Sequence, residues 1–127
     1  ENGIMYVGGA ASIDANLRVE GYSWWPDEEL STIELNEIIV KYCDLKPSIM
    51  VTHEAPDSIL TTIFRGLRKY KDGSRTRQAL DFMFQYHKPK LHIFGHWHID
   101  ADMVIMGTRF ICLGELSYID IETDEYL

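Results

Sequence analysis

The feature that most constrains the fold of this 127-residue chain is the alternation of short apolar runs with segments of helical periodicity. The runs at 48–52 and 91–94 have the length and flanking prolines of buried strands. A segment with helical spacing precedes each run, from 31 to about 44 and from 74 to 87. Because each helix leads into a strand, the pattern predicts an α/β fold.

Both predicted helices carry start signals. Ser31, with Glu34 three residues later, matches a capping box, in which side chains and backbone amides satisfy each other at the first turn. Ser74, directly after a glycine, is the expected N-cap of the second helix. The residues between the first histidine-bearing strand and this helix, at 57–72, are expected to form a loop.

The N-terminal part is expected to hold one strand, from Ile4 to Gly8, followed by a long irregular loop to about Leu30. Tyr22, Trp24 and Trp25 form an aromatic cluster in that loop. Such a cluster is more often a small satellite core that holds a loop down than a substrate wall.

The C-terminal part has strand-like periodicity. Apolar residues alternate at 101–106, a turn is expected at Gly107, and further strands are expected at 109–113 and 118–121. Short alternating runs separated by glycine are typical of antiparallel strands. We therefore expect an antiparallel meander at this end of the sheet.

Histidines follow both apolar runs. His53 comes directly after the first predicted strand, and His96 and His98 come after Gly95 at the end of the second. Ligands and metals collect where the strands of such sheets end, and imidazole is the commonest protein metal ligand. Alternate residues of extended backbone point the same way, and Gly95 is expected to permit a sharp turn. Taken together, the three histidines favour a metal site over polar loop residues.

The remaining histidines and both cysteines have structural interpretations. His87 ends a predicted helix, where the helix dipole favours it, and His92 lies well before the end of its strand. Cys43 and Cys112 are expected to be buried thiols in a reducing cytosol, which predicts a cytoplasmic protein. A disulfide between the two cysteines is the alternative.

Composition excludes some partners. The formal net charge of −8 disfavours a nucleic-acid binder or a protein of anionic membrane surfaces, since both normally carry excess basic residues. No apolar stretch approaches the ~20 residues of a membrane span. We therefore expect no membrane partner and no nucleic-acid partner.

Two motifs carry a resemblance to a known family. Val51-Thr52-His53-Glu54-Ala55-Pro56 and Phe94-Gly95-His96-Trp97-His98 are similar to the last two motifs of the calcineurin-like metallophosphoesterases. The segments 6–14 and 23–29 resemble the stretch between that family's third and fourth motifs. The resemblance covers nearly the whole chain.

The resemblance implies a fold and a position within it. The expected architecture is the C-terminal half of a two-sheet αββα sandwich, with a mixed sheet that has an antiparallel end. Residues 1–127 would form the C-terminal part of a single metallophosphoesterase domain. The family's Asp-x-His, Gly-Asp-x-x-Asp and Gly-Asn-His-Asp/Glu motifs do not occur in this sequence. The missing N-terminal half of the domain is therefore an expected partner.

The resemblance also implies an activity, the hydrolysis of a phosphate ester by hydroxide activated between two divalent metal ions. His53 and His96 would bind one ion and His98 the other. Mn²⁺, Fe, Zn²⁺ and Ni²⁺ all accept such ligands, so ligand type does not choose among them. Because the carboxylate ligands are absent, the chain alone is expected to be inactive. A basic cluster (Arg65, Arg68, Lys69, Lys71) would hold phosphate or simply be solvated.

Two other classes of protein remain open. The chain could be a catalytically inactive metal-binding or protein-interaction scaffold of the same fold. It could instead be a mononuclear zinc protein that uses His53, His96 and His98 alone, since three histidines suffice for one such ion. The sequence does not distinguish phosphoprotein, nucleotide, nucleic-acid or small-ester substrates, although the negative net charge makes a nuclease the least attractive of these.

Overall fold

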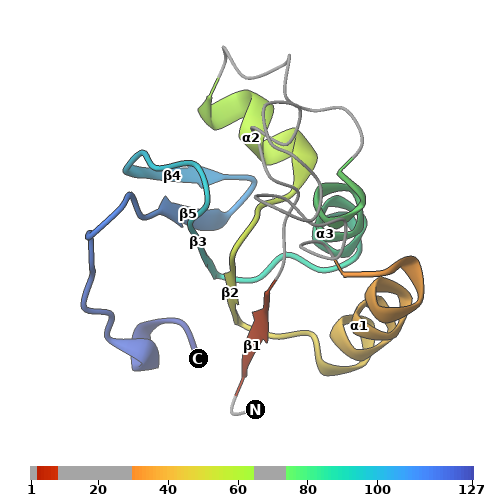
Figure 1. Cartoon of the computed structure of the whole chain (residues 1–127). Coiled ribbons are helices and arrows are strands. Elements are labelled where there is room, and N and C mark those ends of the chain that lie inside the picture. Colours follow the sequence, from red (N-terminus) through yellow and green to blue (C-terminus); the bar gives the residue numbers. More distant parts are fainter. Residues whose placement is uncertain (1–2, 9–29, 65–73) are drawn as a thin grey trace, which may run out of the picture.

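The computed structural model describes residues 3–8, 30–64 and 74–127, which form a five-stranded mixed sheet and three α-helices (Figure 1). The strands follow one another across the sheet in the order β1 (Ile4–Val7), β2 (Ile49–Thr52), β3 (Leu91–Phe94), β5 (Thr108–Cys112) and β4 (Ala101–Ile105). The first four are parallel, and β4 pairs antiparallel with β5 at the edge. The α/β class and the antiparallel end are confirmed, whereas the second sheet of the sandwich stays a prediction.

The capping signals predict the helices correctly. In α1 (Thr32–Leu45) the Ser31 hydroxyl accepts from the Glu34 amide at 3.1 Å, and the Glu34 carboxylate accepts from the Ser31 amide at 3.0 Å. In α3 (Arg75–Tyr86) the Ser74 hydroxyl accepts from the Arg77 amide at 3.2 Å. These bonds satisfy amides that the first helical turn leaves without partners.

One helix was not predicted. The segment expected to begin a loop at Asp57 is instead α2 (Asp57–Ile63), which starts at Pro56. Ile59 and Leu60 are its buried residues. A helix of seven residues spans about two turns, too short for its apolar spacing to be recognised as periodic.

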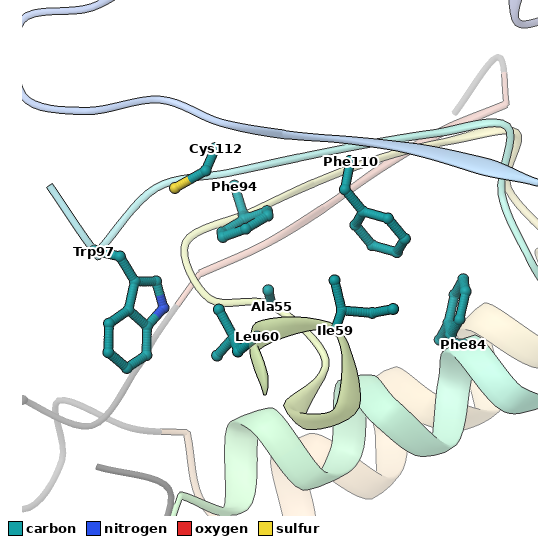
Figure 2. Packing of buried hydrophobic residues seen from close by; sticks show 8 residues of the cluster. All are labelled: Ala55, Ile59, Leu60, Phe84, Phe94, Trp97, Phe110 and Cys112. Carbon is teal, nitrogen blue, oxygen red and sulfur yellow. The ribbon is translucent and has the colours of Figure 1, made fainter. Parts of the chain in front are cut away.

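The two faces of the sheet are covered differently. Alternate residues of each strand point to opposite faces, and α1 and α3 lie on one side while the C-terminal segment runs along the other (Figure 1). Figure 2 shows the cluster on the helical side near α2: Ala55, Ile59, Leu60, Phe84, Phe94, Trp97, Phe110 and Cys112. On the opposite face Ile49, Leu91 and Ile111 are the buried residues. Each such side chain contributes about 1.5–3 kcal/mol on burial.

The expectation of a strand at 118–121 is wrong. Those residues lie outside any strand, and Ile119 and Ile121 instead pack across the second face of the sheet, ahead of a short 3₁₀-helix, η4 (Thr123–Glu125). The reason lies in strand order, because both edges of β5 are already paired, with β3 and β4. Isoleucines at alternate positions are therefore compatible both with a strand and with an irregular segment that packs on an apolar face.

The turn between β4 and β5 is confirmed. Met106 and Gly107, the two residues between these strands, have φ of 52° and 86°. Positive φ at both positions is the requirement of a type I′ hairpin turn, whose twist matches that of the strands. Both cysteines are free thiols; Cys112 is buried as expected, whereas Cys43 is only half-buried.

Several predicted features lie outside the described residues. These are the loop at 9–29 with its aromatic cluster and the basic cluster at 65–71. Within the described ranges, no helix has both the length and the apolar character needed to cross a bilayer.

Candidate metal centre

His53 and His96 meet at the ends of neighbouring parallel strands. His53 directly follows β2, and its amide donates to the Val7 carbonyl at 3.1 Å. Its own carbonyl accepts from the Gly95 amide at 3.2 Å, so the backbone of His53 is held from both sides. Nε2 of His53 lies 3.0 Å from Nδ1 of His96, with the rings inclined at 72°. The sequence-based expectation that these two side chains converge is confirmed.

The separation of the two nitrogens fits a shared ion. Histidine nitrogens bind Zn²⁺ at about 2.0–2.1 Å, so two of them on one ion lie about 2.8–3.4 Å apart, from octahedral to tetrahedral geometry. The observed 3.0 Å is also the length of a hydrogen bond between the rings. Partial burial, and then the nearby His98, lower the pKa of His53. A lowered pKa favours the neutral imidazole that a metal requires.

His98 is not brought into the pair. Its side chain is exposed, and its influence on the pKa of His53 is electrostatic. Among residues 3–8, 30–64 and 74–127, no group of three histidine, cysteine, aspartate or glutamate side chains is arranged to hold a metal ion. The described part of the chain therefore presents two of the three predicted ligands together.

The backbone after β3 differs from the expected extended step. His96 and His98 have φ of 72° and 60°, in the left-handed region that non-glycine residues rarely adopt. The Trp97 amide donates to the Gly95 carbonyl at 2.9 Å, so His96 is the centre of a strained γ-turn. Gly95 itself does not have a positive φ, so the expectation that this glycine supplies the turn is wrong. Strain of this kind costs about 1–3 kcal/mol and clusters at functional sites.

Glu54 is the residue of this region whose role the sequence did not reveal. Its side chain is 0% exposed. Oε1 accepts from Nε1 of Trp97 at 2.6 Å and from the Ala55 amide at 3.1 Å. Oε2 lies 3.6 Å from a guanidinium nitrogen of Arg77 and 3.7 Å from Nε2 of His96. Burial raises the pKa of Glu54 to about 7, against the lowering effect of the Trp97 and Ala55 hydrogen bonds.

Arg77 and Trp97 connect the strand ends to the helices. The Arg77 guanidinium carbon lies 5.7 Å from the centre of a Trp97 ring, and its Nε lies 3.3 Å from Asp57 at the start of α2. Trp97 forms one end of the apolar cluster, near Leu60 (Figure 2). The positions of Glu54 directly after His53 and of Trp97 directly after His96 were the only sequence signals for this network.

His92 and His87 are held by contacts outside the candidate site. Nε2 of His92 lies 2.8 Å from the Thr52 hydroxyl, which itself donates to the Glu54 carbonyl. Burial lowers the pKa of His92 to about 3. Nε2 of His87, at the end of α3, lies 2.8 Å from the Pro47 carbonyl. Both environments are those of structural histidines.

Comparison with known proteins adds no family assignment. No protein-family model matches the chain, and no curated protein is significantly similar to it. The resemblance to the calcineurin-like metallophosphoesterases therefore rests on the motifs around His53 and His96, and it stays a prediction.

Proposed function

We propose that this chain forms the C-terminal half of the catalytic domain of a metal-dependent phosphoesterase. The observation that carries the proposal is the 3.0 Å approach of the His53 and His96 nitrogens at the ends of adjacent parallel strands. Ligands of α/β proteins commonly bind at the carboxyl ends of parallel strands. The substrate class, a phosphate ester, comes from the resemblance of the two motifs.

Each histidine has a defined part in the proposed site. His53 and His96 supply neutral nitrogens to one ion, and His98 on the exposed loop contributes to a second. Divalent ions, when bound there, would supply a water of lowered pKa and neutralise the phosphate charge. The backbone bonds of His53 and the turn at His96 hold the nitrogens in place before any ion binds. This preorganisation reduces the entropy lost on binding.

The proposed architecture includes a second sheet contributed by the N-terminal half of the domain. The face opposite the helices supports this part of the proposal. Tyr6 on the edge strand β1 is 71% exposed, and Val51 and Ile93 are only half-buried. A second sheet packed there would cover apolar side chains that the C-terminal segment leaves partly open. The free thiols of Cys43 and Cys112 support a reducing, cytoplasmic location.

A hydrolysis assay tests the proposal. A protein that carries this chain together with the upstream half of the domain, supplied with Mn²⁺, should hydrolyse a chromogenic phosphate ester. His96→Ala should abolish nearly all turnover, while His87→Ala should leave turnover within a few-fold. The 127-residue chain alone should be inactive, because it lacks bridging carboxylates. Full activity of the His96 variant, or strong hydrolysis by the chain alone, contradicts the proposal.

A mononuclear zinc protein is the second candidate, since the same 3.0 Å pair suits a single ion. Metal stoichiometry separates the two. One tightly held Zn²⁺ in a fully assembled, inactive protein favours the zinc protein, whereas two ions and turnover favour the phosphoesterase.

A further inference from the structure

We infer that Glu54 is a positioning residue, whose buried carboxylate selects the tautomer of His96 that points an unprotonated Nδ1 at His53. This inference rests on the proposed function and deepens it by assigning a role to a residue outside the proposed set of metal ligands. It concerns the metal-free protein first, so it can be tested whether or not phosphate esters are hydrolysed.

Contacts other than the one with His96 hold the Glu54 carboxylate in place. Oε1 accepts two hydrogen bonds, from Trp97 and from the Ala55 amide, and the Thr52 hydroxyl donates to the Glu54 carbonyl. Because hydrogen bonds hold both its carboxylate and its carbonyl, Glu54 loses little further conformational entropy when it interacts with His96. Trp97 directly follows His96, so the same carboxylate also anchors the strained turn on which His96 sits.

The second carboxylate oxygen faces the imidazole. Oε2 of Glu54 is buried and accepts no hydrogen bond from the residues that the structure describes. Nε2 of His96 lies 3.7 Å away, on the opposite side of the ring from the Nδ1 that meets His53. This distance is slightly too long for a hydrogen bond, yet short enough for a strong electrostatic preference at a dry position.

The carboxylate favours one of the two tautomers of His96. A neutral imidazole carries one proton, on either Nδ1 or Nε2. A carboxylate beside Nε2 stabilises an N–H there, which leaves the lone pair on Nδ1, the nitrogen that faces His53. A ligating histidine commonly has this arrangement, with its second nitrogen directed at a carboxylate or carbonyl. Glu54 thus fixes which nitrogen of His96 is available to an ion.

Arg77 explains why the carboxylate is tolerated in the interior. A buried carboxylate without a partner is strongly destabilising. The Arg77 guanidinium lies 3.6 Å from Oε2 and also pairs with Asp57. Asp57 also pairs with Arg77, whereas the ion pair to His96 comes from Glu54, so Asp57 offers a matched control.

The direct test is the tautomer of His96, read from long-range ¹H–¹⁵N couplings of the imidazole by NMR. The metal-free 127-residue chain at about pH 8, above the usual imidazole pKa, should show the proton of His96 on Nε2. Glu54→Gln keeps the shape of the side chain but removes the charge, and its amide can present a donor to Nε2. That variant should shift His96 toward the Nδ1–H form, while Asp57→Asn should leave the tautomer unchanged.

Metal affinity gives the second readout. With Co²⁺ as the probe, Glu54→Gln should weaken binding about tenfold to a hundredfold, and Asp57→Asn should stay within about twofold of the wild type. Glu54→Asp, a shorter carboxylate, should recover part of the tautomer preference. Near-ultraviolet circular dichroism checks that each variant is folded.

The outcomes separate this inference from the proposed function. A wild-type His96 protonated on Nδ1 overturns the inference, even if every Glu54 variant fails to fold. A folded Glu54→Gln protein with an unchanged tautomer overturns it as well. If the tautomer shifts as expected but the wild type binds no Co²⁺, the positioning role stands and the proposed metal site fails.

Discussion

His92 and His96 are only four positions apart in the sequence, yet the two histidines lie in opposite environments. His92, inside β3, is 2% exposed and meets the Thr52 hydroxyl of the neighbouring strand. His96, just beyond the end of β3, sits on left-handed backbone and meets His53 at the carboxyl ends of β2 and β3. The comparison teaches that the place of a histidine along a strand decides whether it is packed in the interior or lies where we propose a metal site.

The same contrast holds for the surrounding groups. Around His92 lie aromatic rings, with the Phe110 ring centre 5.3 Å away. Around His96 lie a second imidazole, a buried carboxylate and the indole of Trp97. The first environment keeps the His92 imidazole neutral by burial, whereas the second places two imidazole nitrogens 3.0 Å apart.

The largest expected effect is the loss of metal binding at the strand ends. His53→Ala or His96→Ala should weaken Mn²⁺ or Zn²⁺ binding by about a hundredfold or more, because each removes one of the two nitrogens proposed to share an ion. Isothermal titration calorimetry on the 127-residue chain measures this effect. Equal metal affinities of the His96→Ala protein and the wild type would show that His96 is not a ligand, and the proposed difference between His96 and His92 would be wrong.

The next effect is on stability, at the other histidine. His92→Ala removes a buried ring and its bond to Thr52, which should lower the free energy of unfolding by about 2–4 kcal/mol. Metal affinity should change little in the folded protein. Urea denaturation gives the first quantity and calorimetry the second. A His92→Ala protein of normal stability that no longer binds metal would reverse the assignment of the two histidines.

A pH dependence follows from the depressed pKa of His92. Between about pH 6.5 and the folded-state pKa of about 3, the unfolded chain binds a proton that the folded chain does not. The free energy of unfolding should therefore fall as the pH falls through this range, by at most about 1.4 kcal/mol per pH unit.

Glu54 acts in the opposite sense. Its pKa is raised to about 7, so the folded state holds a proton that the unfolded state releases, and this adds stability as the pH falls from about 7. The contribution of His92 must consequently be measured as a difference between the wild type and His92→Gln. Urea melts of the two proteins at a series of pH values should converge as the pH falls toward 3. Parallel curves would show that His92 is not held neutral by the fold.

The smallest expected effect lies at the start of α1. Ser31→Ala removes the capping bond to the Glu34 amide and should cost about 1 kcal/mol of stability. Metal affinity and the His96 tautomer should be unaffected, which makes this variant a control for effects that pass only through stability. Thermal melting monitored by circular dichroism checks the cost.

Local signals in the sequence were enough for much of the fold. The caps at Ser31 and Ser74 and the apolar runs before His53 and Gly95 act within a few residues, so they are visible without tertiary information. The convergence of His53 and His96 followed from one further rule, that parallel strands end at the same sheet edge.

The features that sequence reasoning missed depend on tertiary packing. The residues at 118–121 could not be distinguished from a strand, because the strand order that occupies both edges of β5 is a property of the whole sheet. The burial of Glu54 requires Trp97 and Arg77, which come from distant parts of the chain. The left-handed turn at His96 is likewise set by its surroundings and not by the adjacent glycine.

The central claim is that His53 and His96 share one metal ion, and crystals of the chain soaked in Zn²⁺ test it most directly. An anomalous difference map collected at the zinc absorption edge should place a peak about 2.1 Å from both Nε2 of His53 and Nδ1 of His96. The same soak of His96→Ala crystals should lose the peak. A wild-type map with no zinc at this pair, while the rings stay 3.0 Å apart as a hydrogen-bonded couple, would contradict the account.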